Sequence, residues 1–218
     1  MKTTKWVCGA ALAIGVIATS AASAPVSIND PVFGTGSITR AESTGLDWLD
    51  VTESTGLTYD FVQAEFGSGG QFEGFRHATV AEVEALAQAF GFPGLSNTAQ
   101  GSTFAAGQAA VGLLGLTCAG TCGSFWFETL GLAEVDPTST FPSSAPQIRI
   151  AYRTQFSNEG IAGVTGWRGT GLGNESSLVG HYLVREAPPQ IPLPGTLVLL
   201  LGALGGVAVM RERRQTSR

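Results

Sequence analysis

The end of the chain restricts the fold more than any other segment does. Residues 187–210 contain no charged side chain, and residues 197–210 are almost entirely Leu, Val, Ala and Gly. A stretch with no polar face is not suited to a helix on the surface of a water-soluble domain. We therefore expect residues 197–210 to form a transmembrane helix that lies outside the folded body.

The residues on either side of this stretch set its length and direction. A helix beginning at Leu193 would have about 18 residues and reach about 27 Å, which is enough to cross a thin bilayer. Pro192 and Pro194 set its start, because proline is tolerated only in the first turn of a helix. Arginines follow the helix, and the positive-inside rule keeps residues 211–218 in the cytoplasm. The side chains expected to fix this topology are Arg211, Arg213 and Arg214. The alternative is a buried C-terminal core helix, which three glycines would weaken.

The start of the chain has the three parts of a secretory signal peptide. Lys2 and Lys5 give the positive region, residues 6–18 the apolar region, and residues 22–24 (Ala-Ser-Ala) a site for signal peptidase. We expect residues 1–24 to be removed by this enzyme, and an uncleaved membrane anchor is the alternative. Cys8 would leave with the signal peptide.

The segment between the two ends is strongly acidic. Residues 25–187 contain 16 Asp and Glu, six Arg and no Lys. Phosphate binding needs clustered cations, so this balance argues against nucleic acid as a partner and against docking on anionic lipid. We expect residues 25–187 to form one extracytoplasmic domain, followed by a Pro-rich linker that includes the sorting motif, residues 188–196.

A short Pro-containing motif, one apolar helix and a terminal Arg cluster together resemble the PEP-CTERM class of bacterial sorting signals. The closest form is the Pro-Leu-Pro variant, often written VPLPA, and the matching residues are Ile191, Pro192, Leu193, Pro194 and Gly195. Leu193 stands where the commonest form has Glu, and Gly195 where the variant has Ala. The resemblance implies cleavage by an exosortase, a membrane-embedded transpeptidase-like enzyme, in a Gram-negative bacterium. It also implies a link to exopolysaccharide or biofilm matrix. A plain stop-transfer anchor is the alternative.

Local patterns in the body predict helices before strands. Residues 80–90 have one apolar helical face, and Thr79 with Glu82 makes a capping box. A shorter helix is expected at residues 59–66, and a weaker one at residues 105–116. The first two predicted helices are therefore early elements of the domain.

Strand patterns follow later in the chain. Apolar and polar side chains alternate over residues 148–153, which predicts a half-buried strand, and residues 182 and 184 share a face of a last strand. The Gly-rich residues 160–177 indicate a loop or a pair of small strands. Together these elements predict an α+β domain with antiparallel strands, and a β-sandwich is the alternative.

The order of several short strings adds a second resemblance. "TGLDWLD", "TYDFVQAEF", "GFRHATVAEVEAL" and "HYLVRE" follow one another between residues 44 and 186. This order is similar to that of Lcl-type C-terminal domains, which have a C-type-lectin-like fold. The resemblance implies that the α+β body is a single C-type-lectin-like domain.

Two cysteines are the first candidates for specific chemistry. Cys118 and Cys122 are the only cysteines after the signal peptide, and in an oxidising compartment such a pair predicts a disulfide. A redox pair and half of a zinc site are the alternatives. His77 and His181 show no ligand spacing, so we predict no metal site and give both histidines a surface or packing role.

One acidic and aromatic cluster is a candidate for ligand binding. Asp47, Trp48 and Asp50 could bind a sugar directly or through Ca²⁺, although no calcium-loop string is present. We expect Trp48, Trp126 and Trp167 to lie in the core. No nucleophile–base set and no cofactor motif is apparent.

These patterns predict an exported surface or matrix protein rather than an enzyme. Its expected role is structural or adhesive, in contact with extracellular polysaccharide, and no cofactor is expected. A carbohydrate- or Ca²⁺-binding module and an extracytoplasmic enzyme are the alternatives. An enzyme would place a perturbed His or carboxylate in a cleft.

Overall fold

The computed structural model describes residues 23–119, 125–155, 157–169 and 177–189. These residues form two mostly antiparallel sheets and a few helices, which confirms the predicted α+β class. Most of the predicted signal peptide, the sorting motif and residues 197–210 lie outside the described residues. Within the described segments, no helix has the length and hydropathy needed to span a bilayer.

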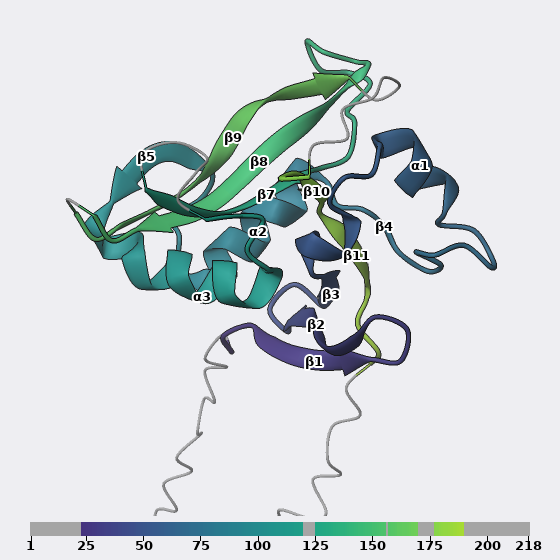
Figure 1. Cartoon of the computed structure of the whole chain (residues 1–218), viewed down its shortest axis with the longest axis horizontal. Coiled ribbons are helices and arrows are strands. Elements are labelled where there is room, and N and C mark those ends of the chain that lie inside the picture. Colours follow the sequence, from purple (N-terminus) through teal and green to yellow (C-terminus); the bar gives the residue numbers. More distant parts are fainter. Residues whose placement is uncertain (1–22, 120–124, 156, 170–176, 190–218) are drawn as a thin grey trace, which may run out of the picture. The chain divides into compact units, whose positions relative to one another are not determined.

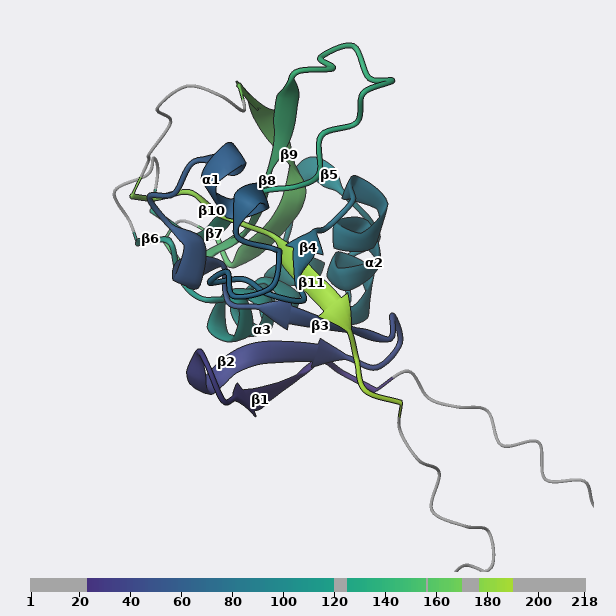
Figure 2. The same ribbon diagram turned by 90° about the vertical axis from the view of Figure 1, so that its right-hand side faces the viewer.

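The first sheet joins the two ends of the described body. Its strands, in spatial order, are β1 (Val26–Asp30), β2 (Gly34–Ala41), β3 (Leu46–Leu49), β11 (Leu183–Glu186) and β4 (Arg76–His77). Figure 2 shows β1, β2, β3 and β11 along one side of the body. β11, the last strand among the described residues, therefore lies inside this sheet, between β3 and β4, and not at its edge.

The second sheet is built around a long twisted strand pair. Its strands, in spatial order, are β10 (Gly180–His181), β7 (Trp126–Leu132), β8 (Ser144–Arg153), β9 (Glu159–Gly169) and β5 (Ser96–Gln100), and β6 (Cys118–Ala119) also pairs with β7. β10 runs parallel to β7, and the other pairs are antiparallel. β8 and β9 extend away from the rest of the body in Figure 1. For residues 160–169, of the predicted loop or pair of small strands, the loop is wrong, because pairing with β8, and with β5 at Gly160 and Ala162, holds them extended in one strand.

Three α-helices and two 3-10 helices complete the described fold. They are α1 (Tyr59–Ala64), α2 (Val80–Phe90), α3 (Phe104–Leu114), η1 (Val51–Ser54) and η2 (Gly101–Thr103). The capping box predicted for Thr79 and Glu82 is present, and Gly91 ends α2 in the left-handed region at φ 104°. α3 approaches β8 closely, since a β-carbon at Gly107 would lie 2.7 Å from the carbonyl oxygen of Ala151.

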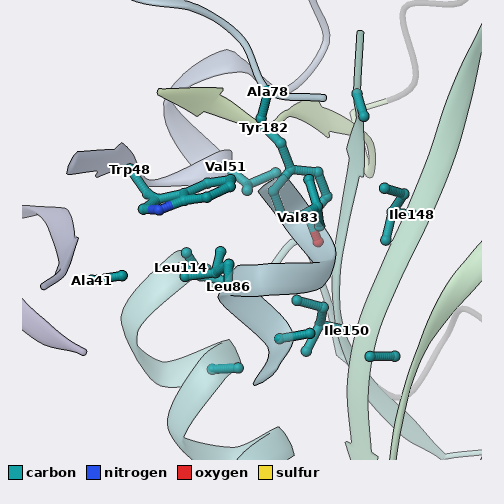
Figure 3. Packing of buried hydrophobic residues seen from close by; sticks show 14 of the residues in the cluster. Ala41, Trp48, Val51, Ala78, Val83, Leu86, Leu114, Ile148, Ile150 and Tyr182 are labelled. Carbon is teal, nitrogen blue, oxygen red and sulfur yellow. The ribbon is translucent and has the colours of Figure 1, made fainter. Parts of the chain in front are cut away.

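The main core lies where the first sheet, α2, α3 and β8 meet (Figure 3). Trp48 and Tyr182 are fully buried there, with ring centroids 6.5 Å apart in an edge-to-face arrangement. Val184 belongs to the same cluster as Tyr182, which confirms the face predicted for the last strand. Ile148 and Ile150 of β8 pack in this core, as the alternation of apolar and polar residues predicts.

Candidate functional site

Two adjoining cavities form a groove where α1, the start of α2 and the loop after β7 meet. The first has a volume of about 410 Å³ and is lined by residues 79–81 and 134–137. The second has a volume of about 340 Å³ and is lined by Tyr59, Asp60, Gln63, Glu134, Val135, Pro142 and Ser143. Glu134 and Val135 line both cavities, so we treat the two as one site and call it the Tyr59 groove.

Tyr59 supplies a nearly buried hydroxyl to this groove. Tyr59 is the first residue of α1, directly after the N-cap residue Thr58, and it is only 6% exposed. The Tyr59 hydroxyl oxygen accepts the N–H of Val135 at 3.1 Å. Its own hydrogen has no acceptor among the described residues, so it remains available to a ligand. Burial raises the pKa of Tyr59, the Val135 N–H lowers it in part, and Glu134 and Asp60 raise it further. Tyr59 is therefore a neutral donor at pH 7.

A pair of buried histidines supports the Tyr59 ring. The ring of His77 stacks on Tyr59 at 3.9 Å between centroids and an interplanar angle of 6°. His77 Nε2 lies 3.1 Å from His181 Nδ1, and His181 Nε2 lies 3.1 Å from the carbonyl oxygen of Leu57. A carbonyl only accepts, so His181 Nε2 carries the hydrogen, and His181 Nδ1 accepts from His77 Nε2–H.

Burial keeps both imidazoles neutral. It lowers the pKa of His77 to about 3, with a further contribution from His181, and it lowers the pKa of His181 to about 4. His77 and His181 are 4% and 1% exposed, and neither residue lines the two cavities of the groove. Both have the packing role predicted as one of the two alternatives, and in this position they orient Tyr59 rather than face a ligand.

Three carboxylates give the groove a negative charge. Asp60, Glu134 and Asp136 are exposed at its lining, and none of them has an ion pair within the described segments. Asp136 also accepts the N–H and O–H of Thr138, which lowers its pKa. The described arginines are engaged elsewhere: five pair with other carboxylates, and Arg168 donates to Gln147.

An exposed aromatic pair adjoins the groove. Phe141 and Trp167 are 48% and 40% exposed, and their ring centroids are 5.2 Å apart with a tilt of 39°. Trp167 lies on β9 opposite Pro146 of β8, and Phe141 directly precedes Pro142, which lines the second cavity. Phe141 is thus next in the chain to a residue of the groove lining, in the loop between β7 and β8. Two large rings left in contact with solvent mark this region for interaction.

The acidic and aromatic cluster predicted from sequence is not assembled as an open site. Trp48 is fully buried and offers no face to a ligand. Asp47 pairs with Arg40 through two short contacts, of 2.7 and 2.8 Å. Asp50 is partly buried, and burial together with Glu53 raises its pKa to about 7. In the described parts of the chain, no three His, Cys, Asp or Glu side chains converge to hold a metal ion.

Only some of the other predicted residues lie in the part of the chain that the structure describes. Cys118 is 3% exposed on β6, whereas Cys122 lies outside the described residues, so their disulfide stays a prediction. The same holds for the sorting motif of residues 191–195 and for the arginines of residues 211–214.

Sequence reasoning missed most of the residues that form the groove. Trp126 and Trp48 are buried as expected, but the prediction that Trp167 lies in the core is wrong. Tyr59 and Glu134 were not selected, because they are distant in sequence and only the fold brings them together. The one local signal was the Asp136-Pro137 turn after an apolar strand, which marks a loop but not a site.

Comparison with known proteins matched no family model, no curated protein and no solved structure. Function is therefore inferred from local chemistry. The relevant features are a cavity with a neutral Tyr59 donor, carboxylates without cationic partners among the described residues, and the exposed Phe141–Trp167 pair.

Proposed function

We propose that this chain is an exported surface or matrix protein that binds extracellular polysaccharide through the Tyr59 groove and the Phe141–Trp167 pair. The observation that carries the proposal is the exposed aromatic pair beside a groove with a free hydroxyl donor. Aromatic faces pack against the C–H faces of sugar rings, and a few placed polar groups bind the sugar hydroxyls. The groove offers both kinds of contact on one surface.

The location follows from the two ends of the chain. We propose a cleaved signal peptide, a C-terminal PEP-CTERM-like sorting signal recognised by an exosortase, and a transmembrane helix at residues 197–210. The body would be the C-type-lectin-like domain that the string order implies. The support from the described residues is the interior position of β11, which ties the exit of the chain to the sheet. A body tethered at that end transmits tension to a strand paired on both sides.

The body is proposed to act by binding rather than catalysis. Its two histidines, whose pKa values are strongly lowered, pack beside Tyr59 and line neither cavity of the groove. Asp50, the carboxyl with the most raised pKa, also lies outside both linings. An enzyme would be expected to present such groups to a substrate.

Oligosaccharide binding by the full-length protein in detergent tests the binding role. The probes are hexamers of glucose, N-acetylglucosamine, glucosamine and galacturonate, and affinity is measured by titration calorimetry. We expect at least one hexamer to bind, and Trp167→Ala to weaken its binding by about tenfold. Phe61→Ala is the matched control, because Phe61 is 45% exposed but lines neither cavity. Equal losses in both variants, or no binding of any hexamer, would contradict the proposal.

Cell fractionation tests the sorting role. In producing cells that lack the sorting enzyme, we expect the full-length chain to accumulate in the membrane fraction. Pro192→Ala with Pro194→Ala should give the same accumulation in cells that retain the enzyme. A chain that is processed equally in all three backgrounds would be a plain anchored or secreted protein.

A further inference from the structure

The charge of the Tyr59 groove restricts the class of polysaccharide. Asp60, Glu134 and Asp136 are exposed at its lining, and no arginine lines either cavity in the part of the chain that the structure describes. Residues 25–187 contain no lysine, and the arginines among the described residues donate to other groups. A polyanionic chain would meet like charges here, at a cost in affinity.

The Tyr59 hydroxyl is an independent sign that the groove takes a polar ligand. This residue is nine-tenths buried, lines the second cavity, and has an O–H hydrogen without an acceptor among the described residues. Its oxygen already accepts the Val135 N–H, and its O–H hydrogen can be donated to a ligand. The carboxylates around it only accept. The groove therefore matches a ligand that carries both oxygen acceptors and strong cationic donors.

We propose that the ligand is a polymer of amino sugars with free, protonated amines, such as a de-N-acetylated glucosamine chain. This inference rests on the proposed polysaccharide binding and names its substrate class. The ring oxygens or hydroxyls accept from Tyr59, the ammonium groups donate to Glu134 and Asp60, and a neighbouring sugar ring packs on Trp167. Hydrogen bonds between an ammonium group and a carboxylate are stronger than those between neutral groups.

A metal ion and a basic peptide are less well matched to the same surface. The described residues contain no convergent set of three metal-ligating side chains. A basic peptide would satisfy the carboxylates, but it would not need the exposed Phe141–Trp167 pair beside them. Amino-sugar polymers use the aromatic surface, the hydroxyl and the carboxylates together.

The test compares hexamers that differ only at the amine. Full-length protein in detergent is titrated with β-1,4-linked glucosamine and N-acetylglucosamine hexamers, a galacturonate hexamer and a lysine hexapeptide. We expect the glucosamine hexamer to bind at least about tenfold more tightly than each of the others. Its affinity should fall as NaCl rises from 50 to 500 mM, because the partly exposed ion pairs are screened.

Two substitutions assign this preference to the groove. Glu134→Gln should lower the affinity for the glucosamine hexamer by about fivefold and leave the N-acetylglucosamine affinity unchanged. Glu73→Gln is the matched control, because Glu73 is exposed and lines neither cavity of the groove. Tyr59→Phe should weaken binding of both sugars, since it removes a donor that does not distinguish them. Thermal unfolding of each variant verifies that it is folded.

The outcomes separate this inference from the function on which it rests. Equal affinity for glucosamine and N-acetylglucosamine hexamers, unchanged in Glu134→Gln, would overturn the amino-sugar assignment and leave polysaccharide binding intact. A preference for galacturonate would do the same. A lysine hexapeptide that competes with equal affinity would show a general cation site and overturn the inference. If no sugar hexamer binds the unsubstituted protein, the proposed function fails as well.

Discussion

At the scale of single residues, the buried histidines should make the stability of the body depend on pH. The pKa of a histidine is about 6.5 in the unfolded chain, whereas burial lowers it to about 3 for His77 and about 4 for His181. Between pH about 6.5 and about 4, the unfolded chain therefore binds protons that the folded body does not. Stability should fall with falling pH in this window, by up to about 1.4 kcal/mol per pH unit for each histidine.

Asp50 should act in the opposite direction. Burial and Glu53 raise its pKa to about 7 from its ordinary value of 3.8, so the folded body holds a proton that the unfolded chain has lost. This contribution to stability is present at low pH and is lost as pH rises through 7. Urea unfolding at pH 7.5, 6 and 5 measures both effects. His77→Gln should reduce the fall in unfolding free energy between pH 7.5 and pH 5, and Asp50→Asn should increase it. Identical slopes in wild type and His77→Gln would refute the assignment.

Residue chemistry was readable from the sequence, but residue exposure was not. Trp48 and Trp167 each stand between one charged and one uncharged residue, yet Trp48 is fully buried and Trp167 is 40% exposed. Trp48 lies on β3 in the main core, whereas Trp167 lies near the end of β9, opposite Pro146 of β8. Asp47 looked like a ligand residue for a similar reason. Its partner Arg40 faces it only through the β2–β3 register, which no local pattern encodes.

At the scale of elements, local signals predicted the parts that fold on local information. The bounds predicted for α2 are those observed, because a capping box starts this helix and Gly91 ends it. α3 was predicted only as a weak helix, since its close packing on β8 depends on Gly107. β9 was expected to be a loop or small strands, because its glycines disfavour an isolated strand. Pairing with β8 along its length, and with β5 at Gly160 and Ala162, holds it extended.

The groove belongs to this scale too, and its position could not have been predicted. Tyr59 begins α1, whereas Glu134 and Val135 follow β7, and they meet through one hydrogen bond from backbone to side chain. Beside them, the Glu134 N–H donates to the carbonyl oxygen of Ala78 at 2.7 Å, just before α2. Three elements that are far apart in the sequence thus define the cavities, and only their tertiary contacts bring the carboxylates together.

At the scale of the whole molecule, one arginine joins the first and last strands of the described body. Arg185 on β11 donates to Asp30 of β1 at 2.7 Å and lies 3.8 Å from Asp47 of β3. Its guanidinium also lies 4.7 Å from the ring centroid of Phe75. The two carboxylate side chains are only 1% exposed, so the arginines beside them stabilise their negative charge. A tether that pulls on the end of β11 is resisted first by these contacts.

Removing this link should destabilise the body more than removing a surface ion pair. Arg185→Gln leaves Asp30 with only the N–H groups of Val32 and Phe33, and we expect it to cost about 2 kcal/mol of unfolding free energy. Arg76→Gln is the matched control. It breaks a pair with Glu82 whose side chains are 45% and 26% exposed, which is expected to cost less than about 1 kcal/mol. Urea unfolding at pH 7.5 gives both values.

Because Arg185 holds the strand next to the proposed tether, its loss should also lower the force at which the body unfolds when pulled from its C-terminal end. Equal stability of the two variants would show that the exit strand is held by its backbone pairing alone.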